Sequence, residues 1–167
     1  MPEAISDTGP VLHLQEIGKL ATLVVAEPLV LPDLVVQELA DRHSGATFLQ
    51  KAGVKFRISQ VETSEWQEVL LTVGPKIQPA DAQVFVLARA GAFKLLTLTD
   101  DLALRQILEV HGSTVVGSVG ILVRAYVAGS LSRDDLANSF DSLTRDSTLH
   151  LSRSFRSYLK TLLNQLP

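Results

Sequence analysis

Short apolar runs alternate with longer segments of helical periodicity along most of the chain. Five runs have the length and composition of β-strands, at residues 3–6, 28–32, 54–59, 94–101 and 113–117. Between and after them, apolar residues recur every three or four positions, as they do on one face of an α-helix. Strands that alternate with helices predict an α/β domain with a parallel sheet and right-handed crossovers. Two further helical segments, 132–146 and 151–166, are expected to close the fold.

Local signals mark several of the expected helix boundaries. Gly18 should interrupt the helical pattern that follows the first strand, and Pro32 suits the first turn of the next helix. Thr63 or Ser64 is expected to cap the helix at 63–73. The helix expected from Pro79 to Gly91 should bury three apolar side chains, Val84, Leu87 and Ala88.

The length of 167 residues fits one domain, and no internal repeat or interdomain linker is present. We therefore expect a single domain over 1–167, with 131–167 as a C-terminal helical extension. The last helix carries an apolar stripe of Leu151, Phe155, Tyr158, Leu159, Leu162, Leu163 and Leu166. This stripe is expected to pack against the domain as core, and contact with another subunit is the alternative.

The composition indicates a globular protein, because 46% of the residues are apolar. No apolar run reaches the roughly 18 residues needed to cross a bilayer, so no membrane association of that kind is expected. The N-terminal sequence MPEAISD lacks the basic and apolar regions of a signal peptide. Cysteine is absent, which rules out disulfides and thiolate metal sites. These features predict a cytoplasmic protein.

Charge is distributed unevenly along the chain. The net charge of −3 argues against a nucleic-acid binder held by bulk charge alone. Residues 1–123 carry 9 basic and 14 acidic side chains, whereas residues 124–167 carry 6 basic and 4 acidic ones. The first part of the chain is therefore acid-rich and the tail is basic.

Acidic residues follow two of the expected strands directly. Asp7 comes at the end of the first strand, and Asp100 and Asp101 come at the end of the run LLTL. Sites in open parallel sheets form outside the carboxyl ends of the strands, at the point where the strand order reverses. Glu38 lies about two turns into the helix after the second strand, and Asp81 lies in the first turn of the helix that begins near Pro79. These acids could therefore meet at one edge of the sheet.

Carboxylates that crowd together in a low dielectric need a cation to remain ionised. Oxygen ligands without cysteine or paired histidine favour Mg²⁺ or Mn²⁺ over zinc. Such a cluster suits phosphodiester hydrolysis, because the metal activates water and stabilises charge on the phosphate oxygens. The alternative is that the acids are helix caps and first-turn residues. Taken singly, Asp81 favours this alternative, whereas for Asp100, or for Asp101 as the N-cap of its helix, the two interpretations are equal.

Four segments resemble the PIN-domain family, in the branch related to VapC-type toxins. They are ISDTGPVLHL…IGKL, VLPDLVVQELA, PADAQVFVLA and LLTLTDDLALRQI…HGSTVVGSVGILVRAYVAG. The resemblance runs from residue 5 to about residue 130 and implies a doubly wound α/β sheet flanked by helices. It also implies a ribonuclease that depends on Mg²⁺ or Mn²⁺, commonly dimeric or of higher order, and bound by an antitoxin protein.

The resemblance assigns catalytic positions to Asp7, Glu38, Asp81 and an acid in the segment TDD. The Thr-x-Asp spelling of the family points to Asp101, whereas Asp100 lies directly at the strand end, so both remain candidates. Asp7, Asp81, Asp100 and Asp101 are the expected metal ligands. One departure is that relatives in this branch more often have Gly-Glu-Ala where this chain has Ala-Asp-Ala at 80–82.

Two hydroxyl positions and one arginine complete the expected site. Thr8 and Thr99 match the hydroxyl residues that support the acids in the family. Arg105, one turn into the helix after Asp101, is the best placed base for guiding RNA phosphates, and an arginine that is solvated or paired with an acid is the alternative. For the basic tail, Arg153, Arg156 and Lys160, we expect the solvated face of an amphipathic helix.

Other chemistries fit the sequence less well. The triplet Asp7-Thr8-Gly9 occurs in aspartic proteases, but those enzymes need two such triplets in a β-rich frame, and this chain has one, in an α/β pattern. Histidines 13, 43, 111 and 150 show no metal-binding spacing and are expected to be surface or packing residues. No phosphate-binding glycine motif is present. A receiver-type phosphoacceptor domain would need a lysine at the end of a strand, but Lys94 stands at the beginning of its expected strand. The sequence therefore favours a metal-dependent endoribonuclease, and a PIN-like binding module without catalysis is the alternative.

Overall fold

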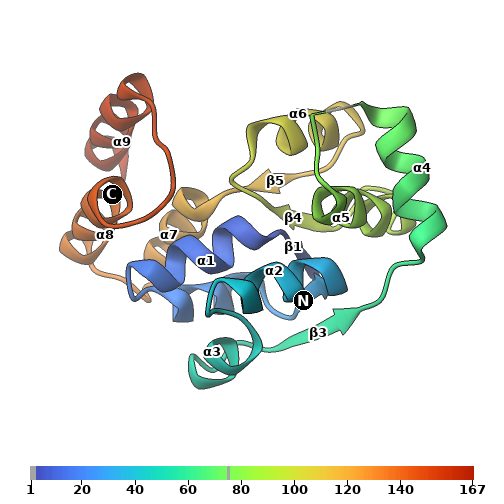
Figure 1. Ribbon diagram of the computed structural model, residues 1–167. Helices are drawn as coiled ribbons and strands as arrows, with labels where there is room; N and C mark the ends of the chain where they lie inside the picture. Colours follow the sequence, from blue (N-terminus) through green and yellow to red (C-terminus); the bar gives the residue numbers. More distant parts are fainter. Residues whose placement is uncertain (1–2, 75) are drawn as a thin grey trace.

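The protein is built around a five-stranded parallel sheet. The computed structural model describes residues 3–74 and 76–167 (Figure 1). The strands are β1 (Ala4–Ser6), β2 (Leu29–Pro32), β3 (Phe56–Ser59), β4 (Leu96–Leu98) and β5 (Val115–Val116). All neighbouring strands pair in parallel, in the order β3-β2-β1-β4-β5. The chain moves outward from β1 to β3 and then crosses to β4 on the other side of β1, which confirms the doubly wound parallel sheet flanked by helices.

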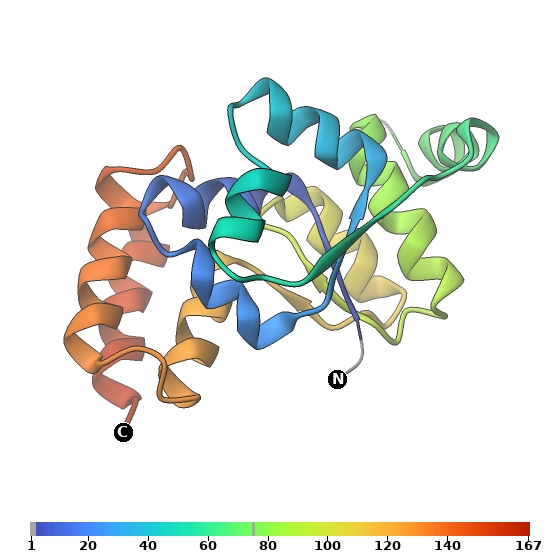
Figure 2. The ribbon, with the colours of Figure 1, turned by 90° about the horizontal axis from the view of Figure 1, so that it is seen from below.

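Helices fill the connections between the strands and continue after the last strand. They are α1 (Thr8–Glu16), the 3₁₀ helix η1 (Leu20–Ala26), α2 (Asp33–Asp41), α3 (Ala46–Lys51), α4 (Thr63–Val73), α5 (Pro79–Ala90), α6 (Leu102–Val110), α7 (Ser118–Val127), α8 (Arg133–Arg145) and α9 (Arg153–Gln165). Helix α5 packs against β1 and β2, and α7 packs against η1 and α1. Helices α8 and α9 lie side by side at one end of the molecule, and α4 lies at the other (Figures 1 and 2).

The core lies around the central strands. Every residue of β1 and β2 is buried, and Leu98 of β4 is fully buried, as expected for apolar strands covered on both faces. Strand β3 is at the edge of the sheet, and its residues Arg57 and Ile58 are exposed. The buried centre and the half-exposed edge follow from the strand order, which local sequence patterns do not specify.

Several expected helix boundaries are confirmed, and others differ. Helix α1 ends at Glu16, and Gly18 follows with a φ of +68°, a conformation that glycine adopts without strain. Helix α4 begins at Thr63, but its cap is Glu62, which makes no side-chain capping bond, so the expected cap at Thr63 or Ser64 was wrong. Pro32 closes β2 and precedes α2 instead of forming its first turn. In α5, Val84 and Ala88 are buried as expected, whereas Leu87 is only half-buried.

The apolar stripe of the last helix is only partly buried. Leu159 is 4% exposed and packs into the core, while Phe155 and Tyr158 are 37% and 50% exposed. Leu162, Leu163 and Leu166 are half-buried against the core. The expectation that the whole stripe forms intramolecular core is therefore wrong for its aromatic residues, because α9 packs mainly on one neighbour, α8. Within residues 3–74 and 76–167, no helix is long and apolar enough to cross a membrane.

Candidate active site

Asp7 lies at the carboxyl edge of the sheet, where β1 and β4 are neighbours. Ser6 pairs with Leu98 in the parallel register, and the backbone N–H of Asp7 donates to the carbonyl of Leu98 at 2.9 Å. The residues that follow Leu98 are Thr99, Asp100 and Asp101. The strand order therefore brings two segments about ninety positions apart together, at the switch point of the sheet.

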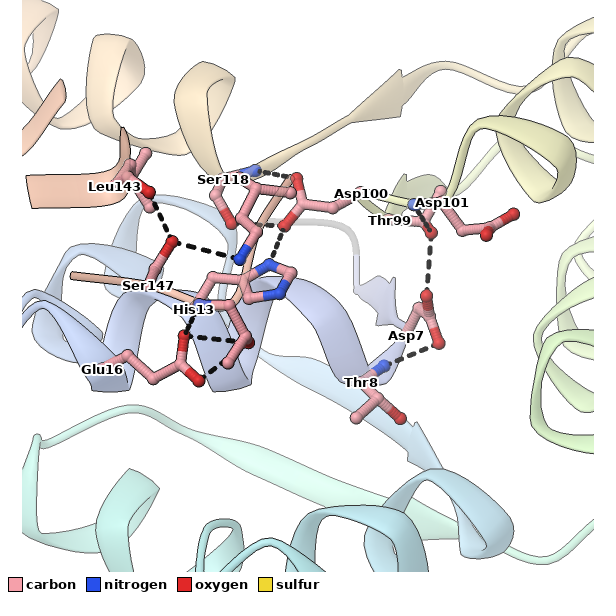
Figure 3. Close-up of polar contacts among 12 residues, drawn as sticks. Asp7, Thr8, His13, Glu16, Thr99, Asp100, Asp101, Ser118, Leu143 and Ser147 are labelled. Carbon is pink, nitrogen blue, oxygen red and sulfur yellow. Dashed lines mark hydrogen bonds and ion pairs between the residues drawn. The ribbon is translucent and has the colours of Figure 1, made fainter. Parts of the chain in front are cut away.

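The carboxylate of Asp7 is buried and held on both oxygens. One oxygen accepts from the backbone N–H of Thr8 at 2.6 Å, and the other accepts from the hydroxyl of Thr99 at 2.8 Å (Figure 3). The same hydroxyl accepts from the backbone N–H of Asp101 at 3.0 Å. Asp7 is only 6% exposed and is the N-terminal cap of α1. Its position is therefore fixed by the helix start and by the neighbouring strand.

Carboxylates from four helix segments line one cavity. The cavity has a volume of about 560 Å³, and its lining includes Asp7, Glu38, Asp81 and Asp101. They come from the starts of α1, α5 and α6 and from the middle of α2. The hydroxyl of Thr8 also lines the cavity and donates to Glu38 at 2.6 Å. The fold thus gathers acids that lie far apart in the sequence around one space.

Burial and mutual repulsion perturb two of these acids. Burial raises the pKa of Asp7 to about 7, and the negative charges of Asp81 and Glu38 act in the same direction. Hydrogen bonds from Thr99 and from the backbone of Thr8 oppose this rise in pKa. Burial also raises the pKa of Asp81 to about 6, and the charges of Asp101 and Glu38 contribute to the rise. The four acids therefore form one electrostatically coupled group, as active-site carboxylates often do.

Asp81 and Asp101 also act as helix caps. Asp81 accepts from the backbone N–H of Gln78 at 2.7 Å in a capping box, and Asp101 accepts from the backbone N–H of Leu104 at 2.7 Å. In each case the bond uses one carboxylate oxygen. The second oxygen of each has no hydrogen-bond partner among residues 3–74 and 76–167. Capping therefore orients these two acids and leaves each with a free oxygen.

Asp100 lies outside this group, although it is adjacent to Asp101 in the sequence. One of its oxygens accepts from the backbone N–H of Ser118 at 2.7 Å, and the other accepts from the Ser118 hydroxyl at 2.5 Å (Figure 3). The second oxygen also lies 2.7 Å from Nδ1 of His13. Asp100 is thus bound to the start of α7 and to α1, and it does not line the cavity.

A close approach of two segments allows this placement of Asp100. A Cβ built on Gly117 would lie 2.5 Å from one carboxylate oxygen of Asp100, which is shorter than real contacts of a Cβ. Glycine at 117 therefore leaves the room that the carboxylate occupies. The segment Gly117–Ser118 then offers its backbone N–H and hydroxyl to the acid.

His13 is a cavity residue that the sequence analysis assigned to the surface or to packing. Its ring lines the cavity and is held at Nδ1 by Asp100, with only 12% of the side chain exposed. Thr148, from the connection between α8 and α9, also lines the cavity and donates to Glu16 from its hydroxyl at 2.8 Å and from its backbone at 2.7 Å. Their partners lie 87 and 132 positions away. The only sequence signal that His13 lies near the site was its position one helical turn after Gly9, in the helix that Asp7 caps.

A family model described as a PIN domain matches residues 3–165 of the chain. The chain belongs to the PIN-domain family. Proteins of this family are generally nucleases. No curated protein sequence matches the chain significantly. The family match confirms the resemblance at the level of the PIN domain, and the matched region includes Asp7, Glu38, Asp81 and Asp101 as well as Asp41, a further acid that lines the cavity.

Arg105 lies beside the acidic edge of this PIN domain but does not line the cavity. Its guanidinium donates to the carbonyls of Val115 at 3.1 Å and Thr99 at 3.4 Å, and it lies 3.4 Å from Glu109. These bonds tie α6 to β5 and to the end of β4. Its predicted role in guiding RNA remains a prediction, and the contacts give it a structural role.

The cavity of the PIN domain offers the oxygen donors that a hard divalent cation prefers, but these donors do not enclose a cation. In the described part of the chain, no three side chains of His, Cys, Asp or Glu converge closely enough to hold a metal ion. The free carboxylate oxygens of Asp81 and Asp101, with Asp7 and Glu38 nearby, are hard oxygen donors in an open cavity that His13 and Arg42 also line. This fits Mg²⁺ or Mn²⁺, because Mg²⁺ is usually bound by one or two carboxylates and keeps several waters.

Proposed function

We propose that this PIN domain is a metal-dependent endoribonuclease that hydrolyses RNA phosphodiester bonds. The observation that carries the proposal is the convergence of Asp7, Glu38, Asp81 and Asp101 on one cavity, with the pKa values of Asp7 and Asp81 raised to about 7 and about 6. Carboxylates that crowd together around a buried acid such as Asp7 are stabilised in the ionised state by a cation. The family match supports a nuclease.

Asp7, Asp81 and Asp101 are the residues that would hold Mg²⁺ or Mn²⁺. We favour Asp101 over Asp100, because Asp101 lines the cavity and Asp100 is bound to Ser118 and His13. When bound, the cation would polarise the phosphate and activate a water molecule. The chain supplies the fixed geometry, since Thr8 and Thr99 hold the carboxylate of Asp7 on both sides.

Glu38 is suited to accept the proton of the attacking water. It is exposed on α2, lines the cavity, and has one carboxylate oxygen bound to the hydroxyl of Thr8 at 2.6 Å. Its other oxygen has no hydrogen-bond partner in residues 3–74 and 76–167. A general base needs a free lone pair within reach of the proton that it removes. We assign this role to Glu38, because Asp7, Asp81 and Asp101 are the proposed metal ligands and because the resemblance to the family gives Glu38, and not the cavity acid Asp41, a catalytic position.

The sequence resemblance to VapC-type toxins extends the proposal to a biological role. In this role the protein is the toxin of a toxin–antitoxin pair, acts on RNA in the cytoplasm, forms a homodimer or higher oligomer, and is bound by an antitoxin protein. The resemblance rests on the segments around Asp7, Glu38 and Asp81 and on the stretch from Leu95 to Gly129. The chemistry of the site would be the same for a PIN-domain nuclease outside such a pair.

One observation favours a second candidate function, a PIN-like module that binds RNA or protein without cleaving it. The acids do not form a closed metal cage in the described residues, and two of them serve as helix caps. Acids that only cap helices would leave the cavity free to bind a partner without catalysis.

The two candidates are separated by incubating the purified protein with labelled RNAs of varied sequence, with Mn²⁺ and with EDTA. An endoribonuclease should cleave at least one RNA with Mn²⁺ and none with EDTA. The variant Glu38→Gln should lose cleavage, whereas Glu68→Gln, at an exposed acid on α4 outside the cavity, should cleave like the parent. Absence of cleavage across all RNAs with Mn²⁺ would support the binding module.

A further inference from the structure

A second concave surface lies between α8 and α9, away from the acidic cavity. This α8–α9 groove has a volume of about 670 Å³. Its floor is apolar and includes Phe140, Leu159 and Leu163, of which Phe140 and Leu159 are only 5% and 4% exposed. Arg133 joins the two helices beside it by donating to the carbonyls of Leu163 and Leu166 at 2.5 and 2.9 Å. The groove is thus a feature of two helices that are fixed to each other.

Four cations surround this apolar floor. They are Arg145, Arg153, Arg156 and Lys160, all exposed, and the only acid that lines the groove with them is Asp141. None of the four cations forms an ion pair or a side-chain hydrogen bond within residues 3–74 and 76–167. The charges are therefore not used to hold the fold together, and their like sign makes the groove strongly positive.

The lining residues of each helix have the spacing of a helix–helix contact. On α8 they include Ala137, Phe140, Asp141 and Thr144, and on α9 they include Arg153, Arg156, Lys160 and Leu163. Residues three, four and seven positions apart lie on one face of a helix. Two such faces with an apolar floor between them form the type of groove into which an amphipathic helix packs its apolar side.

Charge decides which occupant fits. A second copy of the chain, paired through this face by two-fold symmetry, would place the four cations against their own copies. RNA would satisfy the charge but gains little from the floor, because single-stranded bases bind by stacking on accessible aromatic rings and Phe140 is buried. An amphipathic helix with acidic flanks matches both the apolar floor and the cationic rim.

We propose that the α8–α9 groove is a docking site for an acidic amphipathic helix of a protein partner. Apolar side chains of the partner contact the half-buried Leu163 and the small exposed parts of Phe140 and Leu159, and its acids pair with Arg145, Arg153, Arg156 and Lys160. The groove is separate from the acidic cavity and shares no lining residue with it. The proposal therefore does not rest on nuclease activity and stands or falls on binding alone.

The test uses a fluorescein-labelled helical peptide of about 18 residues, or five turns, with leucines on one face and glutamates on its flanks. A control peptide has the same composition with the leucines distributed around the helix. Binding to the full chain is measured by fluorescence anisotropy in EDTA, so that RNA probes are not cut. The variant Arg153→Glu/Arg156→Glu reverses two rim charges, and Arg89→Glu/Lys94→Glu makes the same charge change at exposed positions outside the groove.

The amphipathic peptide should bind the parent, and the groove variant should bind it at least about tenfold more weakly, since rim charges control association. The variant at Arg89 and Lys94 should bind like the parent, and the rearranged peptide should bind at least about tenfold more weakly. Equal binding of the two peptides, or no binding of the amphipathic peptide, would overturn the proposal. If a single-stranded RNA binds more tightly than the amphipathic peptide, and if this binding depends on Arg153 and Arg156, the groove would be assigned to RNA instead. Loss of a dimer in the groove variant, measured by sedimentation, would assign it to a second copy.

Discussion

The ring nitrogen Nδ1 of His13 lies 2.7 Å from a carboxylate oxygen of Asp100, although 87 positions separate the two residues. Both side chains are largely buried, at 12% and 9% exposed. The same carboxylate accepts two bonds from Ser118, so that one acid links α1, the end of β4 and the start of α7. This relationship explains why Asp100 and Asp101, adjacent in the sequence, have different surroundings.

The variant Asp100→Asn should destabilise the fold. Asparagine has the same shape as aspartate but replaces one accepting oxygen with an amide group that donates. That amide would point at His13 or at the backbone N–H of Ser118, which also donate. A lost bond to a charged group costs about 2 kcal/mol, and the melting temperature should fall by roughly 4–8 °C for a domain of this size. Thermal melts check this, and Glu68→Gln serves as a control because that acid is exposed on α4 and forms no ion pair in residues 3–74 and 76–167. A melting temperature equal to that of the parent would contradict the assigned network.

Gly117 and Gly9 provide a matched pair of substitutions around the same acid. An alanine Cβ at 117 would lie 2.5 Å from Asp100 Oδ1, whereas at position 9 its nearest contact would be 3.4 Å from Asp100 Cβ. Gly117→Ala should therefore cost about 1–3 kcal/mol of the free energy of unfolding. Gly9→Ala, inside α1, should leave this free energy within about 0.5 kcal/mol of the parent or raise it slightly. Denaturant titrations of both variants check the difference, and equal effects would contradict it.

Asp7→Asn should abolish RNA cleavage and leave the fold intact, because asparagine keeps the volume and removes one charge from the cavity. Without metal, its melting temperature should exceed that of the parent: the pKa of Asp7 is raised although Thr8 and Thr99 donate to it, so the burial of its charge and the repulsion from Asp81 and Glu38 outweigh those hydrogen bonds. Mn²⁺ at a hundredfold excess over Kd should stabilise the parent by about 2.7 kcal/mol, or roughly 5–11 °C. That rise should shrink in Asp7→Asn. A metal response of unchanged size in the variant would show that Asp7 does not belong to the metal site.

The raised pKa values predict how stability depends on pH when metal is absent. Asp7 has a pKa of about 7 in the folded protein against an ordinary value of 3.8, so the folded state binds the proton more tightly than the unfolded chain does. Stability from this group is complete below about pH 4 and is lost as the pH rises toward 7. Asp81, with a pKa of about 6, adds a loss over the lower part of the same range.

The contribution of Asp7 is isolated by melting the parent and Asp7→Asn in EDTA at several pH values between 4 and 8. The melting temperature of the variant relative to the parent should increase with pH across about pH 4–7 and then level off. A difference between the two proteins that stays constant with pH would mean that Asp7 titrates normally in the folded state.

Local sequence determined the elements and the caps of this protein. Short apolar runs predicted all five strands, and Gly18 and Gly91 predicted the ends of helical segments. Asp7 and Asp101 were predictable as acids between a strand and a helix, because the end of a strand and the cap of a helix depend on residues that are close in the sequence. These features involve contacts within a few positions, and their energies are encoded in adjacent side chains.

Only the tertiary structure decided which acids share the cavity. The sequence left Asp100 and Asp101 as equal candidates for the acid of the site. Neighbouring side chains at a strand end point in different directions, and the strand pattern does not show which of them faces the site. The pairing of β1 with β4 and the contact with Ser118 placed Asp101 at the cavity and Asp100 against His13. The exposure of Phe155 and Tyr158 was decided in the same way, because α9 packs mainly on α8. Such contacts join residues far apart in the chain, and they form only when the whole sheet and its helices close around a common core.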